Sequence, residues 1–123
     1  MTYSRFRSYV AESAVDAFLI VKPGTADRAV VPATAATDLL VGTSDETATA
    51  LGGDVDVAVG DIAYVKLGGT VARGQPITAN ASSLGVVAAP ATGTNNRIIG
   101  FAEVSGVSGD VITYRVAPGV IQG

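Results

Sequence analysis

Histidine and cysteine are both missing from this chain of 123 residues. Without histidine the chain lacks the commonest general base, and it cannot form a Ser–His–Asp triad or a His-ligated zinc site. Without cysteine it has no disulfide, no thiolate ligand and no cysteine nucleophile. Catalysis would have to depend on paired carboxylates or on lysine. We therefore expect a protein that is not an enzyme and that uses no cofactor and no metal ion.

Large aromatic side chains, long apolar runs and positive charge are also scarce. Tryptophan is absent and only four Tyr and three Phe occur, although 48% of the residues are hydrophobic. These are mostly Ala and Val, which bury little area each, so we expect a thin core that gains stability from oligomerisation or docking. No apolar run approaches the roughly 18 residues of a membrane span. A pI near 4.6 disfavours direct contact with nucleic acid. As a separate expectation, the protein is made in a cytoplasm.

Glycine, by contrast, is plentiful, and its 15 residues separate short runs rich in β-branched side chains. Turn signals recur about every eight to twelve residues, a spacing typical of a β-sandwich or β-barrel. The pattern predicts a mainly β fold, a small antiparallel barrel or sandwich with little helix. The predicted strands are 17–21 and 27–31, as a hairpin, then 39–41, 62–67, 70–72, 75–78, 84–88, 97–104 and 111–116. Only residues 11–19 and 43–51 offer a helical turn or two.

Residues 38–61 form an acidic stretch with six of the eleven acidic side chains and no Lys or Arg. The spacing of Asp54 and Asp56 invites comparison with a calcium loop, but Ala58 and Val59 stand where an EF-hand needs ligands. In GGDVDVAVGD the alternation of Asp and Val is instead typical of a strand with buried valines. We predict a solvated strand face there and no metal site.

A weak internal echo links residues 39–59 to residues 98–116. Both segments run from aliphatic residues to Gly, then through a polar stretch to Gly-Asp-Val. Gly-Asp before a strand is a common turn, because Asp caps local amides. The echo reflects either that common turn or two similar β-units in one barrel.

The first nine residues, MTYSRFRSY, differ in composition from the rest of the chain. They hold three of the seven aromatic residues and two of the eight basic ones, with no acid. Chain ends are often frayed, but Tyr, Phe and Arg are enriched at interface anchors. We predict an extended N-terminal arm over 1–16 and a single β-rich domain over 17–123. The predicted contact residues of the arm are Tyr3, Arg5, Phe6, Arg7 and Tyr9.

Lys66 offers a different chemistry, because it precedes Gly68-Gly69 at a possible hairpin tip. Lipoyl and biotinyl domains carry their cofactor on a lysine at such a tip. Neither the Met-Lys-Met nor the Asp-Lys-Ala tripeptide of those domains is present. A carrier domain is therefore the weakest of three alternatives.

Residues 59–120 resemble a known family. The runs are VGDIAYVKLGGTVARGQPIT and LGVVAAPATGTNNRIIGFAEVSGVSGDVITYRVAPG. They contain Gly-Gly-x-Val, an aliphatic pair followed by Gly-x-Ala at 98–102, and Gly-Asp-x-Ile at 109–112. This spacing of glycine and aliphatic residues resembles the small decoration, or cement, proteins of tailed-phage heads.

The resemblance implies a β-barrel or sandwich that acts as a structural virion protein on the capsid exterior. Its partners would be the major capsid protein and other copies of itself, as a homotrimer or sometimes a dimer. It would bridge neighbouring capsid subunits and stabilise the head by multivalent binding. The alternative is a non-catalytic β-sandwich module that binds glycans or a host surface.

Overall fold

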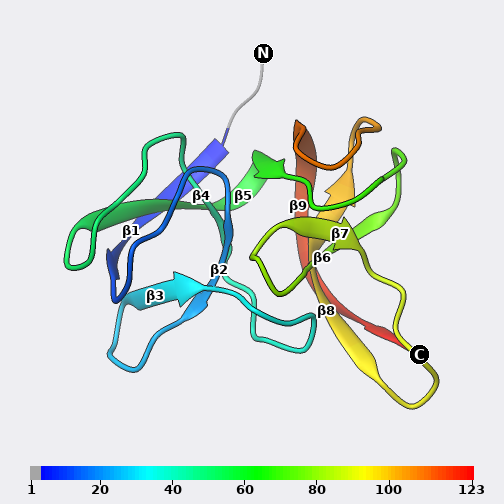
Figure 1. Cartoon of the computed structure of the whole chain (residues 1–123), viewed down its shortest axis with the longest axis horizontal. Coiled ribbons are helices and arrows are strands. Elements are labelled where there is room, and N and C mark those ends of the chain that lie inside the picture. Colours follow the sequence, from blue (N-terminus) through cyan, green and yellow to red (C-terminus); the bar gives the residue numbers. More distant parts are fainter. Residues whose placement is uncertain (1–3) are drawn as a thin grey trace.

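The computed structural model describes residues 4–123 and confirms the mainly β fold (Figure 1). No helix occurs among these residues, so they contain no helix that is long and apolar enough to cross a membrane. The nine strands are β1 Ser4–Ala11, β2 Ile20–Pro23, β3 Ala29–Pro32, β4 Gly42–Ser44, β5 Asp54–Lys66, β6 Pro76–Ala79, β7 Gly85–Val87, β8 Asn95–Ala102 and β9 Val111–Gln122.

The helical turns expected at 11–19 and 43–51 are wrong. The two segments instead form an isolated bridge, in which Val15 and Thr49 exchange backbone hydrogen bonds of 2.9 and 2.8 Å. Val15 is completely buried in the hydrophobic core. A long-range bridge thus takes the backbone groups that a local turn would use.

The first five strands close a barrel. They follow the order β1-β3-β2-β4-β5, and the first part of β5 pairs back with β1, from Val10 opposite Asp54 to Ser4 opposite Asp61. Closure leaves this unit without an exposed sheet edge. Small side chains fill its narrow interior: Ala11, Val15, Val21, Val30, Val55 and Val57.

Read around the barrel in the other direction, the first unit has the order β1-β5-β4-β2-β3. The remaining strands repeat that order as β5-β9-β8-β6-β7, with the second part of β5 in the place of β1. Gly85 of β7 forms a parallel bridge with Leu67, where β3 pairs in parallel with β1 in the first unit. Val71 and Gly106 exchange two backbone hydrogen bonds, as Val15 and Thr49 do. The echo in the sequence therefore corresponds to two β-units joined by β5, rather than to two units within one barrel.

A common core joins the two units. It combines Ile20, Ala33, Leu40 and Ala58 from the first unit with ten buried residues of the second, Tyr114 among them. The Tyr114 hydroxyl forms a 2.9 Å hydrogen bond with the Thr43 hydroxyl across the junction. The Ile20 amide donates to the Ser83 carbonyl, and the Ser83 hydroxyl donates to the Ala33 carbonyl. These contacts fix the units against each other.

Part of the predicted N-terminal arm lies in the sheet of its own chain. Ser4–Ala11 forms β1, which pairs with both β5 and β3. Tyr9 and Ala11 pack towards the core of the first unit, whereas Phe6 and Val10 are exposed. The backbone of this segment is thus engaged within the chain, and its outward side chains remain available to a partner.

Candidate interaction surface

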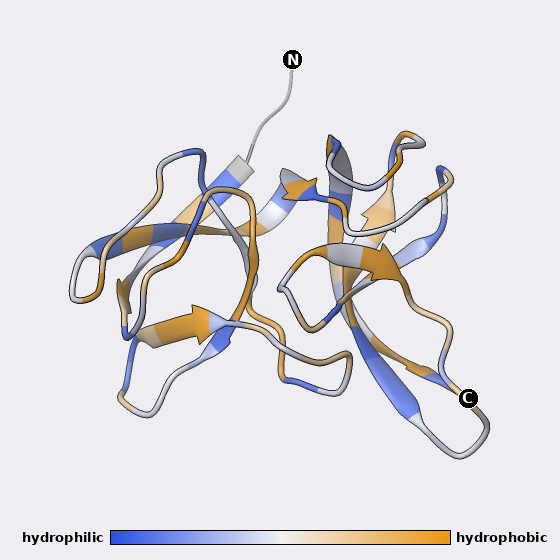
Figure 2. Ribbon diagram, in the orientation of Figure 1, coloured by the Kyte–Doolittle hydropathy of each residue, from blue (hydrophilic) through white to orange (hydrophobic). Residues whose placement is uncertain are grey.

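The acidic face of β5 has the geometry that the sequence predicts. Asp54 and Asp56 are exposed, and they alternate with the buried Val55 and Val57. Figure 2 shows this alternation as blue and orange bands along the part of β5 that belongs to the first unit. Among residues 4–123 no group of three or more acidic side chains could hold a metal ion. The solvated strand face is confirmed.

A pair of aromatic side chains covers the junction between the units. Ala63 and Val65 of β5 point into the core, so Tyr64 between them points outward and is 42% exposed. Its ring lies 5.9 Å from that of Phe18, at an interplanar angle of 54°. The Lys66 amide donates a 3.0 Å hydrogen bond to the Phe18 carbonyl, which holds the loop before β2 against β5.

A second aromatic group lies on the neighbouring strands of the same sheet. Phe101 of β8 is directly opposite Arg115 of β9, and the guanidinium carbon lies 5.9 Å from the centre of the Phe101 ring. These residues line a hollow of about 280 Å³ together with Gly74, Ala102 and Glu103. A cation stacked on an aromatic ring beside a carboxylate suits recognition of a protein surface.

We call the outward side chains of Phe18, Tyr64, Phe101 and Arg115 the aromatic face. Strand pairing brings Tyr64, Phe101 and Arg115 to one side of the second unit, and the loop before β2 places Phe18 against Tyr64. Sequence reasoning did not find them, because each stands alone in its own segment. The alternation in Ala63-Tyr64-Val65 is the one signal that could have pointed to Tyr64.

The predicted contact residues of the N-terminus have different surroundings. Tyr3 lies outside the described residues. Arg5 forms an exposed ion pair of 3.3 Å with Asp61, and Phe6 is 45% exposed. Arg7 is exposed, whereas Tyr9 is partly buried against the core of the first unit. Their contact with a partner stays a prediction, and within the set Phe6 and Arg7 are the better placed.

A groove separates the β3–β4 loop from the open end of the β8–β9 hairpin, where β8 begins and β9 ends. It has a volume of about 260 Å³ and is lined by Leu39, Leu40, Arg97, Ile98, Pro118, Gly119 and Val120. Leu39 and Val120 are 56% and 54% exposed. The Arg97 amide donates a 2.7 Å hydrogen bond to the Ala36 carbonyl, which fixes the hairpin beside the loop.

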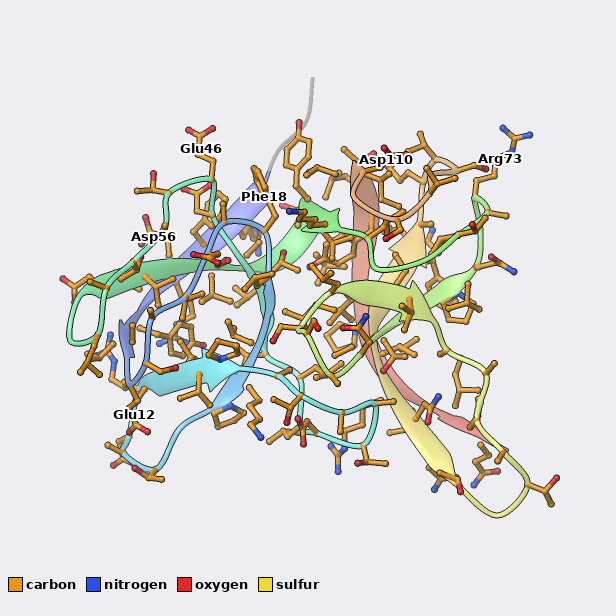
Figure 3. All side chains as sticks on the ribbon, in the orientation of Figure 1. Glu12, Phe18, Glu46, Asp56, Arg73 and Asp110 are labelled. Carbon is orange, nitrogen blue, oxygen red and sulfur yellow. The ribbon has the colours of Figure 1, made fainter. Side chains whose placement is uncertain are left out.

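Charge is divided unequally between the units. Residues 4–61 carry nine acidic and four basic side chains, a formal charge of −5, whereas residues 62–123 carry two acidic and four basic ones, a formal charge of +2. Figure 3 shows Glu12, Glu46 and Asp56 on the first unit and Arg73 at the far side of the second. The molecule is therefore electrically polar along its long axis.

No protein-family model matches this chain, and no curated protein matches it. Among solved structures the chain is similar to the crystal structure of the head fiber gp8.5 N base of bacteriophage phi29. The two share one fold. The TM-score is 0.69 at 15% identity, and the match covers 98% of this chain and 100% of that chain. The likeness therefore includes both units and the β5 strand that joins them.

Proposed function

We propose that the chain is a structural protein of a phage virion that binds the outer surface of the capsid as a homotrimer. In this role it bridges neighbouring subunits of the major capsid protein and stabilises the head. The supporting observation is the similarity, over nearly the whole chain, to the base of a phage head fibre. The spacing of glycine and aliphatic residues in 59–120 independently resembles the decoration proteins of phage heads.

The aromatic face is the surface that we assign to the capsid. Aromatic side chains and arginine dominate the energetics of most protein interfaces. Tyr64 and Arg115 are both exposed, and each is held by a neighbouring aromatic ring, so little conformational entropy is lost on binding. Three copies around an axis would present three such faces, and their binding would be reinforced by effective concentration.

Co-expression with the major capsid protein encoded in the same genome tests this proposal. The chain should co-sediment with assembled shells, be accessible there to an added antibody, and raise the temperature at which the shells open. Arg115→Glu should weaken binding to shells at least about tenfold, because it reverses charge at a packed contact. Arg28→Glu, which reverses another exposed arginine in the β2–β3 turn, is the matched control and should bind normally.

Failure of the wild-type chain to bind intact shells would contradict the capsid role. Glycan binding in its place would favour the β-sandwich binding module. Equal binding by the Arg115 and Arg28 variants would leave the capsid role standing and would move the contact away from the aromatic face.

A further inference from the structure

We propose that the groove between the β3–β4 loop and the β8–β9 hairpin binds the acidic loop of a second copy of this chain. The acidic loop is residues 45–54, which are the connection between β4 and β5 together with Asp54, the first residue of β5. Copies would then associate head to tail, with the first unit of one on the second unit of the next. This inference rests on the proposed homotrimer, because it names the surfaces through which its subunits meet.

The repeat in the fold shows what kind of partner the groove lacks. The first part of β5 is the strand that closes the first unit by pairing with β1. Its second part is the first strand of the second unit, and Ala63 there is buried. The first part of β9 closes the second unit in the same way. Residues 117–122 then continue beyond it, paired with β8 alone among residues 4–123. The end of β9 thus occupies the position that the second part of β5 has at the start of the second unit, and residues 4–123 place no further β-unit against it.

Val120 illustrates this unfilled position. It lies as far beyond Tyr114 in β9 as Ala63 lies beyond Val57 in β5. Ala63 is 1% exposed because the second unit covers it, whereas Val120 is 54% exposed in the groove. The fold therefore presents an apolar surface at a place that its own repeat covers with another β-unit.

Charge complementarity favours the first unit of another copy as the partner that covers the groove. The exposed Arg97 lines the groove and forms no ion pair within residues 4–123. The acidic loop carries Asp45, Glu46 and Asp54 and no basic residue. The positive second unit would repel a second unit of another copy, whereas the first unit, with a formal charge of −5, is attracted to it.

The acidic loop also supplies an apolar side chain of the required kind. Leu51 is 71% exposed, the most of any large hydrophobic residue that the structure describes. Its loop lies at the end of the molecule away from the β8–β9 hairpin (Figure 1). Contact between two different patches at opposite ends is heterologous, and it forms a closed ring when the rotation between copies permits. A trimer is one such ring.

Two variants and their mixture test this arrangement by light scattering across a range of concentrations. Val120→Asp blocks the groove and Leu51→Asp blocks the loop, so each variant alone should be monomeric where the wild-type chain is oligomeric. An equal mixture should form a dimer and nothing larger, because each variant keeps one competent surface. Val107→Asp is the matched control, since Val107 is 55% exposed on a loop of the second unit, and it should assemble like the wild type. Circular dichroism shows that each variant is folded.

The outcomes separate this inference from the capsid role. A mixture that stays monomeric, or a Val120 variant that assembles normally, overturns the head-to-tail contact. A wild-type chain that is strictly monomeric yet binds capsids overturns the contact and leaves the capsid role intact. A third outcome is that the wild-type oligomer dissociates with added salt, the two variants form the mixed dimer, and the wild-type chain does not bind capsids. That outcome supports the contact and contradicts the capsid role.

Discussion

At the scale of single residues, the clearest determinant of this fold is a pair of buried hydroxyls. Tyr114 is completely buried, and burial raises the pKa of its phenol far above the usual range, so it is neutral and able to donate. Its partner Thr43 is also completely buried. The 2.9 Å bond between them links β9 of the second unit to β4 of the first. In a core built mostly of Ala and Val, this bond orients the junction between the units.

Tyr114→Phe should lower the free energy of unfolding by about 1–3 kcal/mol, because it leaves the Thr43 hydroxyl buried without a partner. Adding Thr43→Val should recover much of this loss, since both polar groups are then removed together. Urea denaturation of the two single variants and the double variant measures the coupling. Additive losses in the double variant would contradict the role given to this hydrogen bond.

At the scale of elements, the sequence echo has a physical cause in two glycines. Gly42 of β4 and Gly100 of β8 occupy equivalent places in the two units. A side chain at Gly42 would collide with the carbonyl oxygen of Ala58, and one at Gly100 would collide with that of Arg115. The same close approach of a short strand to a long one thus imposes glycine twice.

Gly42→Ala and Gly100→Ala should each lower the free energy of unfolding by about 1–3 kcal/mol or more, because backbone has to move to admit the methyl group. Gly69→Ala is the control, since the nearest atom to its added carbon is a Val86 methyl at 3.7 Å, an ordinary contact. Thermal and urea unfolding followed by circular dichroism measure the three variants. Equal losses at all three positions would mean that the close approach does not matter.

The sequence predicted several strands to within a few residues, but it placed a strand at 39–41 where the structure has β4 at Gly42–Ser44. The hairpin at 17–21 and 27–31 corresponds to β2 and β3 with a shift of a few residues. β5 was expected as two separate strands, because Gly60-Asp61 reads as a turn. Asp61 does adopt a positive φ of 61°, and the β1–β5 register shifts close by, between Arg5 and Phe6, yet the strand continues.

β1 was not predicted as a strand, because its partner is far away in the sequence. Its composition of aromatic and basic residues indicated an interface, whereas its alternation was hidden by exposed side chains on both faces. Pairing with β5 supplies the order that local propensity does not. The aromatic face was missed for a related reason, since only strand order brings Tyr64, Phe101 and Arg115 to the same side.

At the scale of the whole molecule, the two units share a core and should therefore unfold together. Four residues of the first unit belong to the larger cluster, and β5 runs through both units. Circular dichroism and tyrosine fluorescence should give coincident urea transitions, the behaviour of a two-state domain. A stable intermediate that keeps one unit folded would contradict this expectation. A fragment of residues 4–61 should remain unfolded when expressed alone, because Ile20, Ala33 and Ala58 would lose their covering.

The continuity of β5 has a mechanical consequence. Its 13 residues form one continuous strand that spans at most about 43 Å, at roughly 3.3 Å per residue. Tension applied between the two units is therefore carried by covalent bonds, and each half of β5 is loaded in shear against the strands beside it. Many backbone hydrogen bonds would have to break at once for the units to part. If one unit is held by a capsid subunit and the other by a neighbouring copy, β5 would resist their separation under tension.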